Sequence, residues 1–181
     1  MIKKILSYYK LPLLISATLT VTLLALGAVR MPWPIAEIIV GCFLGTFILD
    51  SEYVMYAYIL EPNTEFSKSV VGYIKYRDFG GLIEFINTHK NEVTDRALNS
   101  ALFQAILVPI AIFAVYASQS LLIQALILST LASSIYKLIE SIFEGKISEW
   151  FWAMKVKPTK SGAVGFTMFL LLVLIYCLYV F

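Results

Sequence analysis

Charged residues and histidine are scarce in this sequence. Asp, Glu, Lys and Arg together make up 14% of its 181 residues, and histidine occurs once. Ordinary soluble domains are about a quarter charged, whereas 60% of this chain is hydrophobic and its mean hydropathy is +0.82. A soluble core could not bury that much apolar surface. We therefore expect an all-α integral membrane protein, with most of its apolar side chains facing lipid.

Several common chemical motifs are also missing. The two cysteines, Cys42 and Cys177, lie in apolar segments without C-x-x-C spacing, which argues against a disulfide framework or a zinc site. The sequence has no Gly-rich phosphate loop, no Walker-type lysine and no Gly-x-Ser-x-Gly. The single histidine, His89, lies in a polar stretch, where we interpret it as a solvated or capping residue rather than a ligand. Nucleotide hydrolysis and serine-hydrolase chemistry are therefore not expected.

Five apolar stretches approach or exceed the roughly 20 residues that cross a bilayer. We predict a bundle of transmembrane helices at residues 11–29, 35–60, 97–116, 121–142 and 163–181. Residues 62–96 form the only long polar stretch, and the helical spacing of their apolar residues predicts a cytoplasmic amphipathic segment on the membrane surface. We expect a single transmembrane domain over residues 1–181, because nothing in the composition divides the chain.

Basic residues predict the orientation of the bundle. Lys and Arg number three before the first span, five between the second and third, and four between the fourth and fifth, where Trp150, Phe151 and Trp152 are expected to anchor the chain at the interface. The opposite side has only Arg30. The positive-inside rule then predicts a multi-pass protein of the cell membrane with a cytoplasmic N-terminus and an external C-terminus.

The second span contains a Gly-x-x-x-Gly pattern at Gly41 and Gly45, which allows another helix to approach closely. We favour packing within one chain, and a dimer contact stays open. At 1.5 Å per residue, residues 35–60 would be roughly 39 Å long, which exceeds a hydrocarbon core of about 30 Å. The helix therefore either continues past the interface or breaks near Asp50 and Ser51.

Two carboxylates, Asp50 and Glu52, lie inside this apolar segment, and carboxylates at membrane depth mark functional sites by default. The predicted topology brings them to the depth of polar residues on the third and fourth helices, near Gln104. The expected polar cluster comprises Asp50, Glu52, Asn99, Ser100, Ser133, Lys137 and Glu140. Lys137 is the expected partner of Asp50 or Glu52, since unpaired charges at that depth are costly.

Three short motifs carry a resemblance to a known family. They are Asp50-Ser51-Glu52, Arg96-Ala97-Leu98-Asn99-Ser100 and Ser133-Ser134-Ile135-Tyr136-Lys137. They resemble the Asp-x-Asp, Arg-x-x-His-Ser and His-x-x-x-Asp motifs of the membrane-bound metal-dependent hydrolase family (the YbcI/YdjM-like group). Asn99 and Ser133 replace the two histidines, and Lys137 replaces the last aspartate. The resemblance implies a divergent member whose metal-ligand set is incomplete and whose lysine would repel a cation.

We therefore expect a non-catalytic relative of these hydrolases that acts through packing, partner or lipid contact, without a cofactor. One alternative is a membrane-embedded hydrolase of lipid-linked or headgroup substrates, with Asp50 and Glu52 as catalytic candidates and Mg²⁺ or Mn²⁺ held by them with Glu140. Another is a small transporter or channel subunit with Glu37 and Asp50 on an ion path. The expected partner is the lipid bilayer, with a second copy or another membrane protein left open; nucleic acid is not expected, because the basic residues flank the spans.

Overall fold

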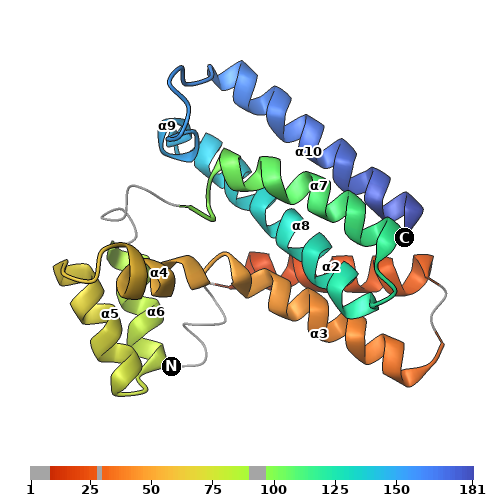
Figure 1. Cartoon of the computed structure of the whole chain (residues 1–181), viewed down its shortest axis with the longest axis horizontal. Coiled ribbons are helices and arrows are strands. Elements are labelled where there is room, and N and C mark those ends of the chain that lie inside the picture. The colour runs from red at the N-terminus through yellow and green to blue at the C-terminus, as the bar shows by residue number, and fades with distance from the viewer. Residues whose placement is uncertain (1–8, 28–29, 90–96) are drawn as a thin grey trace.

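The computed structural model describes residues 9–27, 30–89 and 97–181, and within these ranges the chain is helical without strands (Figure 1). The all-α expectation is thus confirmed for this part of the chain. The elements are α2 (Lys10–Leu26), α3 (Pro32–Ile48), α4 (Ser51–Met55), the π-helical turn η1 (Tyr56–Leu60), α5 (Glu65–Lys75), α6 (Phe79–His89), α7 (Ala101–Ala117), α8 (Leu121–Phe143), α9 (Ile147–Trp150) and α10 (Lys160–Val180).

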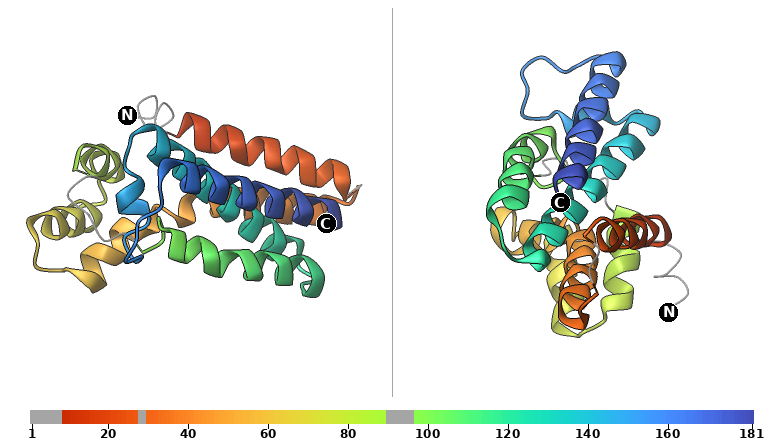
Figure 2. Two further views of the ribbon diagram at one scale, coloured as in Figure 1. Left: turned by 90° about the horizontal axis from the view of Figure 1, so that it is seen from above. Right: turned by 90° about the vertical axis from the view of Figure 1, so that its right-hand side faces the viewer.

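Helix α8 is the centre of the bundle. It contacts α2, α3, α7 and α10, and the long helices run side by side in the left view of Figure 2. Every residue from Leu128 to Ile135 is buried. A helix that is buried on all sides must have neighbours around its whole circumference, so the bundle is organised around this middle stretch of α8.

Helices α3 and α8 make the closest contact in the bundle, through the predicted glycines. A Cβ atom added at Gly41 would lie 2.9 Å from the Ala125 Cβ, and one added at Gly45 would lie 2.8 Å from the Ser129 Cβ. The Ser129 hydroxyl donates to the Cys42 carbonyl at 2.7 Å. The Gly-x-x-x-Gly pattern therefore packs within the monomer, as favoured above, against small residues of α8.

Helices α4, α5 and α6 and the turn η1 form a smaller unit at one end of the bundle (Figure 1). Their apolar side chains pack on one another in a second core, which includes Tyr53, Phe66, Val70 and Leu82. Over residues 62–89 the predicted amphipathic segment is therefore two short helices, and its last residues, 90–96, lie outside the described part of the chain. Thr64 caps the first of them by accepting from the Ser67 N–H at 3.2 Å. The apolar face of this segment packs largely on protein.

Fewer helices than predicted are long and apolar enough to cross a membrane. In the described residues α8 and α10 meet that standard, and α3 with the segment Ser51–Leu60 does so only if the two are counted as one bent span. Helices α2 and α7 have 17 residues each and are shorter. Length and composition therefore support two or three membrane spans, where five were predicted.

The predicted boundaries needed correction at two helices. The span predicted over residues 35–60 ends as a straight helix at Ile48 and turns by 52° before continuing as α4 and η1. The span predicted from residue 97 begins at Ala101, because Ser100 is extended and its hydroxyl accepts from the Phe103 N–H at 3.2 Å as an N-cap. In both cases a polar side chain bonded to the backbone lies at the helix boundary: Ser51 after the end of α3 and Ser100 before the start of α7.

Candidate functional site at the break after helix α3

The chain breaks its helix at Leu49 and Asp50, in the middle of an apolar sequence. The Asp50 N–H bonds to the Phe47 carbonyl at 3.0 Å, a tighter turn than an α-helix makes, and the Ser51 hydroxyl donates to the Ile48 carbonyl at 2.6 Å. The Leu49 carbonyl accepts from the Asn99 amide at 3.3 Å. Side chains thus satisfy backbone groups that the break would otherwise leave without partners.

The Asp50 side chain forms an ion pair with Lys137 of α8. The Lys137 Nζ lies 2.6 Å from Asp50 Oδ1, and about a fifth of each side chain is exposed, 21% for Lys137 and 19% for Asp50. Lys137, the predicted partner of Asp50 or Glu52, therefore binds Asp50. The pair links the break to α8, so the bend after α3 is held against the central helix.

The Glu52 side chain is buried, with 1% of its surface exposed. Its hydrogen-bond donors come from the segment before α7, whereas the partner of Asp50 comes from α8. Glu52 Oε1 accepts from the Leu98 backbone N–H at 2.7 Å, and its Oε2 accepts from the Asn99 amide at 2.5 Å. Both donors belong to the segment just before α7. Charge-assisted bonds of this kind are about twice as strong as neutral ones, so Glu52 fastens α4 to the beginning of α7.

Of the remaining residues of the predicted cluster, Asn99, Ser100 and Ser133 are buried and Glu140 is exposed. Ser100 is a helix cap, as described above, and the Ser133 hydroxyl is buried without a hydrogen-bond partner in the described part of the chain. Asn99 Oδ1 is buried in the same unpartnered state. Glu140 is exposed, and none of the contacts described for residues 30–89 and 97–181 joins it to Asp50 or Glu52. Glu140, which was predicted to belong to the cluster, lies on the exposed side of α8, apart from these contacts.

A second buried polar contact joins α7, α8 and α9, and it was only partly foreseen. The Gln104 side chain is fully buried; its amide donates to the Ser134 hydroxyl at 3.0 Å, and its carbonyl accepts from the Trp150 indole at 3.0 Å. Trp150 and Phe151 are 5% and 4% exposed. Both were predicted as interfacial anchors, but they pack inside the protein: Gln104 provides the Trp150 indole with a buried acceptor, and Phe151 packs edge-on against Phe166.

The ligand chemistry of the site is limited. No group of three or more His, Cys, Asp or Glu residues suited to a metal occurs among the described residues. Asp50 borders a cavity of only about 20 Å³, beside Tyr53. His89 lies at the end of α6, stacked on Phe85 with ring centroids 4.3 Å apart. In this arrangement Asp50 and Glu52 both accept hydrogen bonds, and His89 lies outside the polar cluster.

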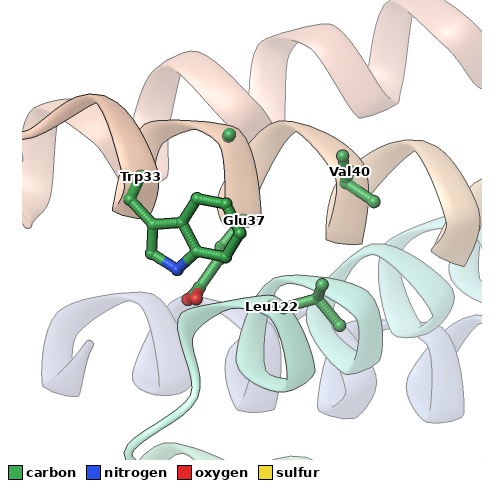
Figure 3. A pocket seen from close by; sticks show the side chains of 5 residues that line it. Trp33, Glu37, Val40 and Leu122 are labelled. Atoms are coloured by element: carbon green, nitrogen blue, oxygen red, sulfur yellow. The ribbon is translucent and has the colours of Figure 1, made fainter.

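Glu37, which was considered above with Asp50 as part of an ion path, lies far from this site. It borders a small apolar cavity of about 190 Å³ with Trp33, Val40 and Leu122, and Figure 3 shows its side chain beside the Trp33 indole, over the start of α8. Glu37 and Asp50 are thirteen positions apart in the sequence, which corresponds to about 20 Å of α-helix. The two carboxylates therefore do not belong to one site.

Comparisons with protein-family models, with curated proteins and with solved structures each found no match to this chain. The class of protein is consequently defined by the structure itself. It is an all-α protein with two or three helices able to cross a membrane and a buried polar cluster where one of them breaks.

Proposed function

We propose that this chain is a multi-pass membrane protein that acts without catalysis, through packing, lipid contact or a membrane-protein partner. The ion pair between Lys137 and Asp50 is the observation that carries this proposal. An ammonium group 2.6 Å from the carboxylate occupies one of its oxygens and repels a second cation. It also lowers the cost of holding either charge at membrane depth. The more exposed of the two catalytic candidates thus has a structural partner.

The proposal includes all five spans. Helices α2 and α7 are each about 26 Å long at 1.5 Å per residue, at the lower end of the range for transmembrane helices. Both pack along α8 and would share its depth. Among the described Lys and Arg residues, only Arg30 lies between α2 and α3, at the end opposite the break after α3. This asymmetry supports a cytoplasmic N-terminus and an external C-terminus.

The contacts at the break also support descent from the metal-dependent hydrolases that the sequence resembles. The three motif-bearing segments lie in contact: Asp50 with Lys137, and Glu52 with Asn99. In the family pattern, Asn99 stands where a histidine would be and Lys137 where an aspartate would be. Both replacements are hydrogen-bond donors directed at carboxylates. We infer that donors have taken the place of a cation in neutralising these carboxylates.

One observation favours the hydrolase alternative. Asn99 Oδ1 and Ser133 Oγ, at the two positions that correspond to family histidines, are buried without partners in the described chain. Buried polar atoms are rarely left unsatisfied, and a bound water or ion would satisfy both types of oxygen. In that case the protein would act on lipid-linked or headgroup substrates at the cytoplasmic interface.

Metal analysis separates these two functions. Protein purified in mild detergent without chelator is expected to contain no stoichiometric Zn, Mn or Mg, in the wild type and in Asp50→Ala alike, because the carboxylates are bound to donors. Elemental analysis by mass spectrometry measures this directly. Stoichiometric metal in the wild type that disappears in Asp50→Ala would establish the hydrolase alternative instead.

The ion pair makes a second prediction. Lys137→Ala should lower the free energy of unfolding by about 1–2 kcal/mol, less than the 3–5 kcal/mol of a fully buried pair, because both side chains are partly exposed. The double variant Asp50→Asn with Lys137→Met should recover at least half of that loss. Thermal unfolding in detergent measures both.

A matched control for this test lies on the same helix end. Lys146 pairs with Glu144 at the same 2.6 Å, but the two side chains are 32% and 37% exposed. Lys146→Ala should therefore change stability by less than about 0.5 kcal/mol. Equal losses for the two lysines, or no recovery in the double variant, would show that the Asp50 pair is not structural.

A further inference from the structure

A larger hollow than those beside Asp50 and Glu37 is lined by neither Asp50 nor Glu52. It has a volume of about 400 Å³ and is bounded by the first turns of α7 and α10, by the end of α9 and by the segment that joins α9 to α10. This volume is within the range of about 300–1,000 Å³ found for small-molecule sites. In Figure 1 these elements meet near the label of α9. We call this hollow the α7–α10 groove.

Small residues create the groove, and a rigid floor keeps it open. Ala101, Ala105 and Gly162 line it without filling it. The floor is Trp150, held by its bond to Gln104, and Phe151, which packs edge-on against Phe166 with ring centroids 5.7 Å apart. Because these aromatic rings are fixed by buried contacts, they cannot turn to close the space.

The open rim of the groove is apolar and exposed. Leu102, Met154 and Val156 line it, and they are 53%, 51% and 84% exposed. Exposed apolar walls of this kind are expected where lipid covers the surface. A ligand that enters from the bilayer would therefore meet no polar barrier.

Three exposed lysines adjoin one edge of the groove in the sequence, and none of them lines it. Val156 and Pro158 line the groove, and the residues that alternate with them and follow them are Lys155, Lys157 and Lys160, all exposed. Residues 150–166 contain no carboxylate. The nearest in the sequence are Glu149 and Glu144, and Glu144 is paired with Lys146. The first turn of α10 adds the positive end of a 21-residue helix.

The dimensions favour a flexible chain over a helix as the occupant. A helix with its side chains is about 10–12 Å across, so 400 Å³ would hold only about one turn of it. An acyl chain is narrower and would fill the same volume along its length. The exposed lysines beside the groove would then lie near the phosphate that such a chain carries.

We propose that the α7–α10 groove binds one anionic phospholipid of the cytoplasmic leaflet, with an acyl chain in the groove and its phosphate at Lys155, Lys157 and Lys160. The inference rests on the proposed membrane topology, which puts these lysines at the cytoplasmic headgroups. It names the lipid contact through which the protein would act. Catalysis on the lipid is not involved.

Native mass spectrometry of the full chain in mild detergent tests the proposal. Dioleoylphosphatidylglycerol should form a single adduct about tenfold or more tighter than dioleoylphosphatidylcholine, because three lysines contribute to binding the anionic headgroup. Ala105→Phe should abolish the adduct by filling the groove, with thermal unfolding as a check that the variant is folded. Glycerol 3-phosphate should not displace the lipid; displacement would mean that the site takes a soluble phosphate, which overturns the lipid assignment.

A matched pair of triple variants separates the site from general surface charge. Lys155→Gln with Lys157→Gln and Lys160→Gln should remove the preference for phosphatidylglycerol. Lys68→Gln with Lys75→Gln and Arg77→Gln, which neutralises three exposed basic residues on and just after α5, should retain it. Equal losses in both, or none in either, would overturn the proposal. The readout uses neither metal nor the Asp50 pair, so its failure is distinguishable from a failure of the proposed function.

Discussion

Replacing Glu52 with Ala is expected to lower the free energy of unfolding by about 3 kcal/mol or more. The change removes a carboxylate that accepts from the Leu98 N–H and the Asn99 amide in a site with almost no exposure. Buried donors that lose their acceptor carry the full cost of desolvation, about 1–3 kcal/mol each. Because the bonds join α4 to the segment before α7, amide exchange should also quicken there. Denaturant or thermal unfolding in detergent, with hydrogen exchange, measures both effects.

Two variants make this prediction specific. Glu52→Gln should lose less than Glu52→Ala, because it keeps an acceptor for the Leu98 N–H and its new amide can donate to Asn99 if that side chain turns its free Oδ1 toward it. Glu140→Ala should change stability by less than about 0.5 kcal/mol, since Glu140 is exposed. If Glu140→Ala were as damaging as Glu52→Ala, the structure would be wrong about which carboxylate belongs to the site.

Adding a single methyl group at Gly45 is expected to be nearly as costly. In Gly45→Ala the new Cβ would lie 2.8 Å from the Ser129 Cβ and closer still to the Leu126 backbone carbonyl. A backbone atom cannot move aside as a side chain can, so α3 and α8 would have to separate. Overpacking of this kind costs about 1–3 kcal/mol, and the upper part of that range applies here because the contact joins α3 to the central helix. Thermal unfolding in detergent measures the loss.

Gly165 supplies the matched control. It lies in α10, also in an apolar helix, and a Cβ added there would meet nothing within 4 Å. Gly165→Ala should be neutral or stabilise the protein by up to about 1 kcal/mol, because alanine is the better helix former. A neutral Gly45→Ala variant would contradict the close packing of α3 on α8. Loss of an oligomer without loss of stability would instead show that the glycines serve contacts between copies.

The sequence predicted that Lys137 pairs with a carboxylate. It did not predict that Asp50 would bind Lys137 while Glu52 binds the segment before α7. Asp50 and Glu52 are two residues apart, and the cost of an unpaired charge applies equally to both. The 52° turn after α3 decides which one faces α8 and which one faces the start of α7. That turn depends on contacts from Ser51 and Asn99, which periodicity alone does not reveal.

The burial of Trp150 is another feature that the sequence alone did not predict. A tryptophan in a basic connection beside a span is typical of an interfacial anchor, and that was the prediction. Its burial depends on Gln104, 46 positions earlier in the chain, which offers an acceptor inside the protein. A buried glutamine opposite a tryptophan can be recognised only once the two segments are known to meet.

The sequence by itself determined that this chain is built of helices, that apolar surface dominates it, and that Asp50, Glu52 and Lys137 are the charges most in need of partners. These properties follow from composition and spacing, because the cost of exposing backbone or burying charge is the same in any fold that places them in an apolar setting. Only the tertiary structure decided how many helices reach spanning length, which carboxylate Lys137 binds and where a groove stays open. Those outcomes depend on which segments meet, since capping bonds, ion pairs and unfilled space arise between residues far apart in the chain.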